Sequence, residues 1–407
     1  MRRLGRPVIA VAAVLLLAGC GAAAKASNPT WVPQPSFQGE GQVPPNGSVD
    51  PTTPDPGPTG PAVPGPQQSG PRPSPTKGPD PYVVATKLTA PVGIAVLPDG
   101  TALVGERTTG RIVRVQPAPG RPVTTVRTLQ GISTAGGGGL LDLALSPNYA
   151  QDSLIFAYLS TPTDNRVVAF TLTGPVTPVL TGIPRGSSDN VGRIAFGADG
   201  LLYVGTGDAG HPAFAADPRS LAGKVLRVSD IGQPAAGNPA PSSPVFTSGH
   251  RVVSGLCSDP DAGSFVEVES RGRAEPGNVY VLDAGEFYGW PTPGSSTQDP
   301  ITTLPTGQGG PGGCAVLDNQ LYVTSLTGKS LLSAPLTASG AGLAAGKFVA
   351  ALQNKYGRLL TVVADPVNGV LWLTTSNRDG HGRPVASDER VLRIPPPSGG
   401  GGGDSPA

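Results

Sequence analysis

Short stretches of alternating hydrophobic and polar residues recur along the chain between residues 82 and 394. Residues 201–204 and 370–373 lie within such stretches and are predicted to be β-strands. Turns rich in Pro, Gly, Asp and Asn separate pairs of such stretches. No stretch has the three-turn amphipathic pattern of a persuasive helix. The pattern therefore predicts an all-β protein built from antiparallel strands.

One unit, made of a strand, a turn, a second strand and a third short strand, recurs six times. Its turns lie near Pro98, Pro147, Ala198, Pro260, Asp318 and Pro366. Their mean spacing of about 54 residues is close to that of propeller blades. We therefore predict a six-bladed β-propeller of four-stranded antiparallel blades. The segment YVVATKL, which begins at Tyr82, would add the outer strand of the last blade and close the ring. A two-sheet antiparallel sandwich is the alternative fold.

The first twenty residues have the layout of a secretory signal. Arg2, Arg3 and Arg6 form a positive region, and residues 8–17 form an apolar run too short to span a bilayer permanently. The run ends in Leu-Ala-Gly-Cys, which resembles the lipobox of bacterial lipoproteins, in which the cysteine is acylated. We therefore expect lipidation at Cys20 and a place on the extracytoplasmic face of the cell membrane. A plain signal peptide with an incidental cysteine is the alternative.

Composition divides the remainder of the chain into three parts. Residues 21–81 are dominated by Pro, Gly and Ser, with few large apolar side chains, and are predicted to form a disordered tether. Residues 82–394 form the propeller domain. Residues 395–407, with their run of glycines, are predicted to be a disordered tail. The chain is thus expected to carry one folded domain, joined to the membrane through a lipid anchor and a long linker.

Charge and cysteine content limit the possible partners and the compartment. The chain has 29 basic and 28 acidic residues, a balance that gives no indication of nucleic-acid binding. Besides Cys20, only Cys257 and Cys314 are present. An even number of cysteines in an oxidising compartment favours a disulfide between these two, and a pair of unlinked buried thiols is the alternative.

Several familiar motifs are absent or incomplete. Gly328-Lys329-Ser330 looks like the end of a phosphate-binding loop, but Val323 stands where the first glycine of that loop is required. The chain contains no Gly-x-Ser-x-Gly elbow and no His-Glu-x-x-His motif. The spacing of its three histidines does not favour a three-histidine metal site.

Six further motifs lie along the repeats, and they are GGLLDLALSPNY at Gly138, VGRIAFGADGLLYVGTGD at Val191, LAGKVLRV at Leu221, GHR at Gly249, GEFYGWP at Gly285 and SLTGKSLLSAPL at Ser325. Through these motifs, nearly all of residues 82–394 resembles the soluble quinoprotein glucose/sorbosone dehydrogenase family, whose members are six-bladed propellers that bind pyrroloquinoline quinone (PQQ) with calcium and oxidise sugars. The proline-rich N-terminus and the segments STPTDNRVV at Ser160 and DPRSLAGKVLRV at Asp217 more closely resemble an actinobacterial lipoprotein.

The resemblance implies a base that removes the proton of the sugar C1 hydroxyl while hydride passes to the quinone. The family's catalytic histidine lies four residues before the arginine that is Arg193 here, and Asp189 holds that place. Asp208 matches the carboxylate that orients the histidine. Asp189 and Asp208 are therefore the candidate catalytic residues.

The family's cofactor-binding positions are only partly matched. Arg251 and Arg358 correspond to cofactor-binding arginines, whereas Val252 and Leu360 replace an asparagine and a second arginine. Thr327 replaces a lysine, with Lys329 two residues away, and Gly137 replaces a glutamine. The family's Glu-His-Gly-Pro calcium loop reads Glu-Ser-Arg-Gly over residues 269–272, so the metal ligands remain unknown. The candidate cofactor-binding residues are Arg251, Arg358 and Lys329.

Two interpretations of these residues stay open. In the first, the protein is a PQQ-dependent sugar dehydrogenase in which burial and the neighbouring Asp208 raise the pKa of Asp189. In the second, it is a non-catalytic propeller that binds a glycan, a lipid head group or an envelope protein, with Asp189 and Asp208 as polar ligands. Arg193, Arg251 and Arg358 would also suit a purely structural role as bridges between blades. The sequence identifies no protein partner.

Two histidines lie near these positions. His250 of the Gly-His-Arg motif is expected to be a packed histidine at a strand edge, and His211 lies in the loop after Asp208, within reach of a pocket mouth. Neither is a secure substitute for the missing catalytic histidine.

Overall fold

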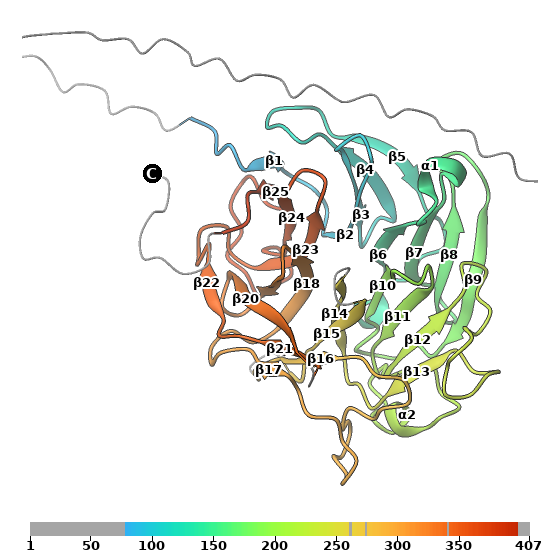
Figure 1. The fold of residues 1–407 in the computed structure, drawn as a ribbon. Helices are drawn as coiled ribbons and strands as arrows, with labels where there is room; N and C mark the ends of the chain where they lie inside the picture. The colour runs from blue at the N-terminus through green and yellow to red at the C-terminus, as the bar shows by residue number, and fades with distance from the viewer. Residues whose placement is uncertain (1–77, 260–262, 273–274, 340–341, 398–407) are drawn as a thin grey trace, which may run out of the picture. The chain divides into compact units, whose positions relative to one another are not determined.

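The computed structural model describes residues 78–259, 263–272, 275–339 and 342–397. It is an all-β ring of six small antiparallel sheets, which confirms the predicted six-bladed propeller (Figure 1). The predicted signal peptide, Cys20, almost all of the tether and most of the tail lie outside the described residues. Among the residues described, no helix is long and apolar enough to cross a membrane.

The first three blades each contain four strands in sequence order. Blade one consists of β2 (Pro91–Val96), β3 (Ala102–Glu106), β4 (Arg111–Val115) and β5 (Thr124–Thr128). Blade two consists of β6 (Leu140–Leu145), β7 (Ile155–Ser160), β8 (Asn165–Phe170) and β9 (Val176–Ile183). Blade three consists of β10 (Gly192–Phe196), β11 (Leu202–Thr206), β12 (Lys224–Val228) and β13 (Val245–Ser248). These blades follow the repeat that the spacing of the turns predicted.

The last three blades vary this plan. Blade four consists of β14 (Val253–Asp259), β15 (Ser264–Glu269), β16 (Asn278–Val281) and the short β17 (Thr302–Thr303). Blade five consists of β18 (Pro311–Leu317), β19 (Gln320–Ser325), the long β20 (Ser330–Ser339), β21 (Gly342–Ala345) and β22 (Val349–Ala351). Because β20 is long enough to pair with both β21 and β22, this blade has five strands rather than the four predicted.

Blade six joins the two ends of the domain. It consists of β23 (Leu359–Asp365), β24 (Val370–Thr375), β25 (Val391–Ile394) and, as its outer strand, β1 (Val83–Ala85). Val83 pairs with Leu392 and Ala85 with Val391. The predicted closure of the ring by the segment from Tyr82 is therefore confirmed.

Helix is confined to single turns in the loops of the described chain. These are the 3-10 turn η1 (Ala135–Gly137), α1 (Tyr149–Asp152) and α2 (Ala213–Ala216). Lys224 anchors α2 to blade three, because its ammonium group donates hydrogen bonds to the carbonyl oxygens of Phe214, Ala215 and Ala222 at 2.6–3.0 Å.

The innermost strands β2, β6, β10, β14, β18 and β23 surround the central axis, and each contacts the inner strands of both neighbouring blades. Glycines permit the close approach of these strands. A Cβ atom at Gly93 would collide with the backbone of Asp142 and Leu143, and one at Gly312 with the backbone of Leu360. Apolar clusters fill the spaces between the sheets, and one of them joins side chains of blades two and three, among them Phe156, Tyr158 and Val204.

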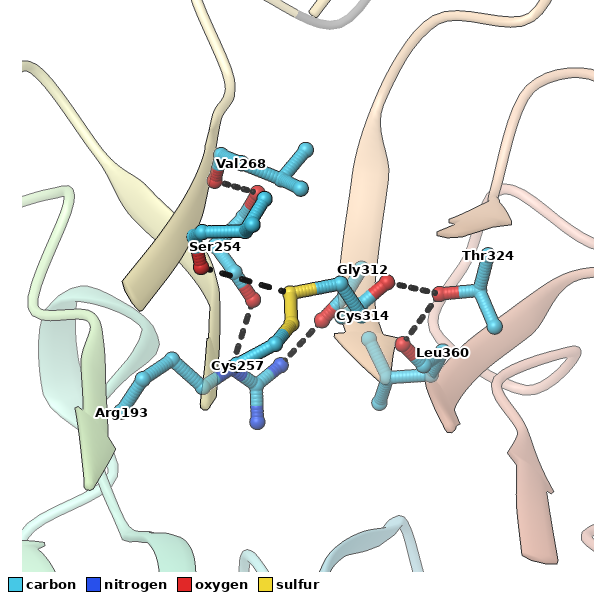
Figure 2. The surroundings of a disulfide bond; sticks show 10 residues. Arg193, Ser254, Cys257, Val268, Gly312, Cys314, Thr324 and Leu360 are labelled. Carbon is cyan, nitrogen blue, oxygen red and sulfur yellow. Dashed lines mark hydrogen bonds between the residues drawn. A yellow bond between two sulfur atoms is a disulfide. The ribbon is translucent and has the colours of Figure 1, made fainter. Parts of the chain in front are cut away.

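A disulfide joins the inner strands of blades four and five. Cys257 on β14 and Cys314 on β18 are bonded through their sulfur atoms, with Cα atoms 5.9 Å apart, and both side chains are buried (Figure 2). The linked residues are 57 positions apart in the chain, so the bond closes a large loop. This is the pairing that the cysteine count favoured.

We expect the double replacement Cys257→Ala and Cys314→Ala to lower the free energy of unfolding by about 4 kcal/mol. Without the disulfide, the unfolded chain is no longer closed into a loop, so its conformational entropy is higher. Urea denaturation of the variant and the wild type would measure the difference. Mass spectrometry of the wild-type cysteine peptides without reduction is the control, and recovery of both peptides with free thiols would contradict the disulfide.

Candidate functional site

A cavity of about 550 Å³ lies where β10, β14, β18 and β23 begin, at one end of the central channel. This volume is within the range of small-molecule sites. The charged side chains in its wall come from several blades and their loops, and they are Asp189, Arg193, Arg251, Arg358 and Asp379. Three arginines against two aspartates give the wall a formal excess of positive charge, which suits an anionic ligand.

Asp189 occupies the pocket wall in the loop between β9 and β10. Burial, and then the like charge of Asp208, raise the pKa of the Asp189 carboxyl, and the positive charge of Arg251 opposes this change. Its backbone has a φ of 51°, in the left-handed region that aspartate tolerates better than most residues. A carboxylate with a raised pKa facing a cavity is a reasonable general base.

Asp208 is buried and is not part of the pocket wall in the described structure. Its Oδ2 atom accepts a hydrogen bond from the indole Nε1 of Trp290 at 2.8 Å, and its Oδ1 atom accepts one from the backbone N–H of Gly210 at 2.8 Å. Both carboxylate oxygens are thus engaged. Asp208 acts as a positioning residue that holds Trp290 and influences Asp189 through its charge.

Arg251 connects the pocket wall to the neighbouring loop. Its guanidinium lies 5.1 Å from the ring centre of Trp290, a cation–π contact, and its Nη1 atom donates a hydrogen bond to the carbonyl oxygen of Arg271. Its backbone N–H donates to Oε1 of Glu269 at 2.9 Å. The sequence singled out Arg251 but not its stacking partner Trp290, although the GEFYGWP motif contains that tryptophan.

The carbonyl oxygen of Arg271 lies in the segment that aligns with the family's calcium loop. In the resemblance, the Gly-Pro pair of that loop aligns with Arg271 and Gly272. Because the Arg271 carbonyl accepts a hydrogen bond from a guanidinium, a cation placed against it would be repelled. The residues of this loop therefore do not fit calcium ligation through that carbonyl.

Arg358 forms an ion pair inside the pocket wall. Its Nη2 and Nε atoms lie 2.9 Å and 3.1 Å from Oδ2 of Asp379, and its Nη1 atom donates to the carbonyl oxygen of Leu326 at 3.2 Å. Asp379 follows β24 in a loop that is marked in the sequence only by its polar composition, so Asp379 was not predicted. Arg107 was also missed. Its Nη1 atom donates to the carbonyl of Gly138 at 3.1 Å, beside the pocket.

The structure leaves other candidates outside this pocket. Lys329 is not among the residues of its wall in the described part of the chain. It lies in the turn between β19 and β20, with a φ of 51°. His211 is exposed and packs against Phe214, also outside the wall, whereas His250 is completely buried, as expected for a packed histidine.

Arg193 separates the pocket from a second cavity of about 370 Å³ in the channel between the inner strands, because it lines both. Its Nε atom donates to the carbonyl of Ser254 at 2.7 Å, and its Nη2 atom donates to the carbonyl of Gly312 (Figure 2). Asp142 lies 4.0 Å from its Nη1 atom. One buried guanidinium thus links blades three, four and five, as the structural interpretation of this arginine anticipated.

We expect Arg193→Leu to lower the free energy of unfolding by about 3 to 5 kcal/mol, because it leaves the carbonyls of Ser254 and Gly312 and the Asp142 carboxylate without their buried cation. Urea denaturation would measure this loss. Arg219→Leu is the control, since the Arg219 side chain is 90% exposed and its variant should unfold at the wild-type midpoint. Equal midpoints for the Arg193 variant and wild type would contradict the bridging role.

The ring of blades and the basic pocket at one end of its axis define the class of six-bladed propellers with an axial ligand site. Residues 88–311 match the family model described as glucose/sorbosone dehydrogenase, and the chain belongs to that family. Its fold is similar to the PQQ-bound form of an aldose sugar dehydrogenase from Streptomyces coelicolor, at 39% identity and a TM-score of 0.71, over 77% of this chain and 96% of that one.

Two further proteins are similar to this chain, one in structure and one in sequence. A protein from Thermus thermophilus, described as a glucose dehydrogenase-type oxidoreductase, is 34% identical with a TM-score of 0.70, over 77% of this chain and 98% of that one. Quinoprotein glucose dehydrogenase B of Acinetobacter calcoaceticus is 27% identical over 252 residues, 52% of each chain. The chain spans between 52% and 61% of the length of the curated relatives it matches.

Proposed function

We propose that the pocket binds PQQ and a sugar, and that Asp189 removes the proton of the sugar hydroxyl. The observation that carries this proposal is the convergence of Arg193, Arg251 and Arg358 with Asp189 on one cavity. The Streptomyces relative, which is 39% identical, is known in a PQQ-bound form, and this supports the choice of cofactor. PQQ, when bound, would accept the hydride that leaves the sugar carbon.

Each charged residue at the pocket has its own role in the proposed reaction. Arg251 and Arg358 would neutralise carboxylates of the anionic cofactor, with Arg193 adding positive charge at the floor of the cavity. Asp189 would accept the hydroxyl proton, for which its carboxyl must be ionised. Asp208 keeps Trp290 in place through the indole hydrogen bond, and thereby the face on which Arg251 rests. Because the Arg271 carbonyl is engaged by Arg251, the proposed reaction includes no calcium-dependent step.

One observation favours the second interpretation, a non-catalytic propeller that binds a glycan or another envelope component. Arg358 is already neutralised by Asp379. An uncharged, hydroxylated ligand would leave this ion pair intact, whereas a carboxylate would compete with Asp379 for the guanidinium. The affinity for PQQ therefore decides between the two functions.

We expect the purified protein to bind PQQ in calorimetric titration, and Arg251→Ala and Arg358→Ala each to weaken binding at least tenfold through loss of a charge-assisted hydrogen bond. Arg219→Ala, at an exposed site, is the matched control and should bind like the wild type. The absence of binding at millimolar PQQ would contradict the proposal and favour the non-catalytic propeller.

Turnover of aldoses, measured by dye reduction in the same samples, tests the role of the base. Because the pKa of Asp189 is raised, its ionised form is lost as the pH falls through that raised value, so turnover should fall on the acid side. Asp189→Asn should abolish turnover and retain PQQ binding. Undiminished turnover in this variant would remove Asp189 from the mechanism.

We also propose that the mature chain is held on the extracytoplasmic face of the cell membrane by a lipid on Cys20, which lies outside the described residues. The lipobox-like sequence and the proline-rich segment of residues 21–81 support this location.

We expect the wild-type chain, expressed in a bacterial host, to partition into the detergent phase after Triton X-114 extraction, and the Cys20→Ser variant to move to the aqueous phase. The reason is that acyl chains supply the membrane affinity. Mass spectrometry of the N-terminal peptide would identify the acyl groups. A wild-type chain found wholly in the aqueous phase would contradict the anchor.

A further inference from the structure

A second cluster of side chains that could bind a ligand lies behind the pocket wall, in the interior of blade four. His250 belongs to the loop between β13 and β14, and Glu267 and Glu269 lie on β15. Two residues apart on one strand, the glutamates project from the same face of the sheet. All three side chains are completely buried. Neither the fold nor the proposed sugar oxidation accounts for two carboxylic acids at this place.

The polar atoms of the cluster converge without satisfying one another. One potential ligand atom from each residue lies within 4.8 Å of the others. His250 Nδ1 lies 3.1 Å from Glu267 Oε2, yet neither atom forms a hydrogen bond with any described residue. Glu267 Oε1 and Glu269 Oε2 likewise lack hydrogen-bond partners among the described residues. Buried carboxylates are rarely left in this state, because they lose the hydration of their charge.

The imidazole of His250 is held in a fixed orientation. Its Nε2 atom lies 2.8 Å from Thr247 Oγ1, and its ring stacks on Tyr288 with the ring centres 4.7 Å apart. Histidines that bind metals are commonly held in this way, by a hydrogen bond at one nitrogen that orients the other. Here Nδ1 is the nitrogen that lies beside the Glu267 carboxylate.

The positive charge in direct contact with the cluster is too small for two carboxylates, although the charge of Arg271 acts on Glu269 without an ion pair that the described residues show. Only the backbone N–H of Arg251 donates to Glu269 within the described structure, while the Arg251 guanidinium is used by Trp290 and the Arg271 carbonyl. Within the described residues, neither glutamate forms an ion pair with an arginine or a lysine, and only Glu267 lies within 4 Å of an imidazole nitrogen, Nδ1 of His250.

We propose that His250, Glu267 and Glu269 bind a divalent transition-metal ion, of which Zn²⁺ is the best match. One imidazole and two carboxylates form a nitrogen and oxygen donor set that suits zinc better than calcium, which prefers oxygen ligands alone. Zinc–ligand distances of about 2.0–2.2 Å place neighbouring ligand atoms roughly 3 to 3.5 Å apart. The 3.1 Å separation of His250 Nδ1 and Glu267 Oε2, without a hydrogen bond, is the spacing that two ligands of one ion require.

The site differs from the family-like calcium loop, since it uses side chains rather than the backbone of Arg271 and Gly272. Glu269 nevertheless connects it to the pocket, because Glu269 accepts the Arg251 backbone N–H and is followed directly by Ser270 in the pocket wall. A bound ion would fix the segment that carries Arg251. The inference does not depend on the proposed sugar oxidation.

We expect the untagged full-length chain, stripped with EDTA and dialysed, to take up one Zn²⁺ per chain with micromolar or tighter affinity in competition with a chromogenic chelator. Glu267→Gln and Glu269→Gln should each weaken uptake at least tenfold, because the metal requires ionised carboxylates. His381→Gln, at an exposed histidine, and Asp365→Asn, at a buried aspartate of blade six, are matched controls and should bind like the wild type.

Two measurements on the wild type keep the proposal testable if a variant fails to fold. Zn²⁺ should raise the melting temperature by several degrees and Ca²⁺ should not. X-ray absorption should show one imidazole and oxygen ligands, with no sulfur. The proposal is overturned if no stoichiometric zinc is taken up, if sulfur is found, or if Glu267→Gln binds zinc like the wild type. The proposal is also overturned if zinc leaves the melting temperature of the wild type unchanged and the Glu267→Gln variant is more stable than the wild type. That result would show that a proton shared by the two glutamates, and not a metal ion, compensates their charge.

Discussion

The antiparallel pairing of β1 with β25 closes the ring, and the geometry of the domain depends on it. Blade six takes its outer strand from the N-terminal end of the folded chain and its other three strands from the C-terminal end. Without β1, β25 would present unpaired backbone groups along one edge, which proteins avoid. Closure also fixes the distance between the inner strands of blades one and six. The pocket draws its wall from loops of several blades, so its shape follows from this closure.

Polar and covalent links join the inner strands at the centre of the ring, in addition to the apolar side chains that line the channel. Arg193 joins the inner strands of blades three, four and five through two carbonyl oxygens, and the disulfide joins blades four and five a few residues away. Glycines such as Gly93 and Gly312 allow the close approach of the inner strands. A guanidinium with several donors in a fixed plane is well suited to connect backbone groups from separate sheets. Arg193 is therefore explained by the architecture, whatever ligand occupies the pocket above it.

The sequence was sufficient for the fold because its signals are local and repeated. Turn spacing and strand alternation recur in each blade, so an irregular unit, such as the five-stranded blade, does not hide the others. The pocket is different, since its residues come from loops that the repeat pattern does not describe. Asp189, Arg251 and Arg358 were found through short motifs, whereas Asp379 stands in a loop that no motif marks. Lys329 was inferred from proximity in sequence to Thr327, and the turn that contains it does not contribute it to the pocket wall.

The buried carboxylates of blade four illustrate a limit of motif comparison. Glu269 belongs to the segment aligned with the calcium loop, and Glu267 lies two residues earlier on the same face of β15. From sequence alone, a strand that alternates apolar and acidic residues is predicted to have one face exposed to water. Only the structure shows that this face is completely buried against His250. In a fold whose strands are covered on both faces by neighbouring blades, a polar residue at every second position cannot be assumed to face water. Such residues need a partner. No arginine or lysine in the described structure forms an ion pair with either glutamate, and in the proposed site His250 and a cation supply the partner.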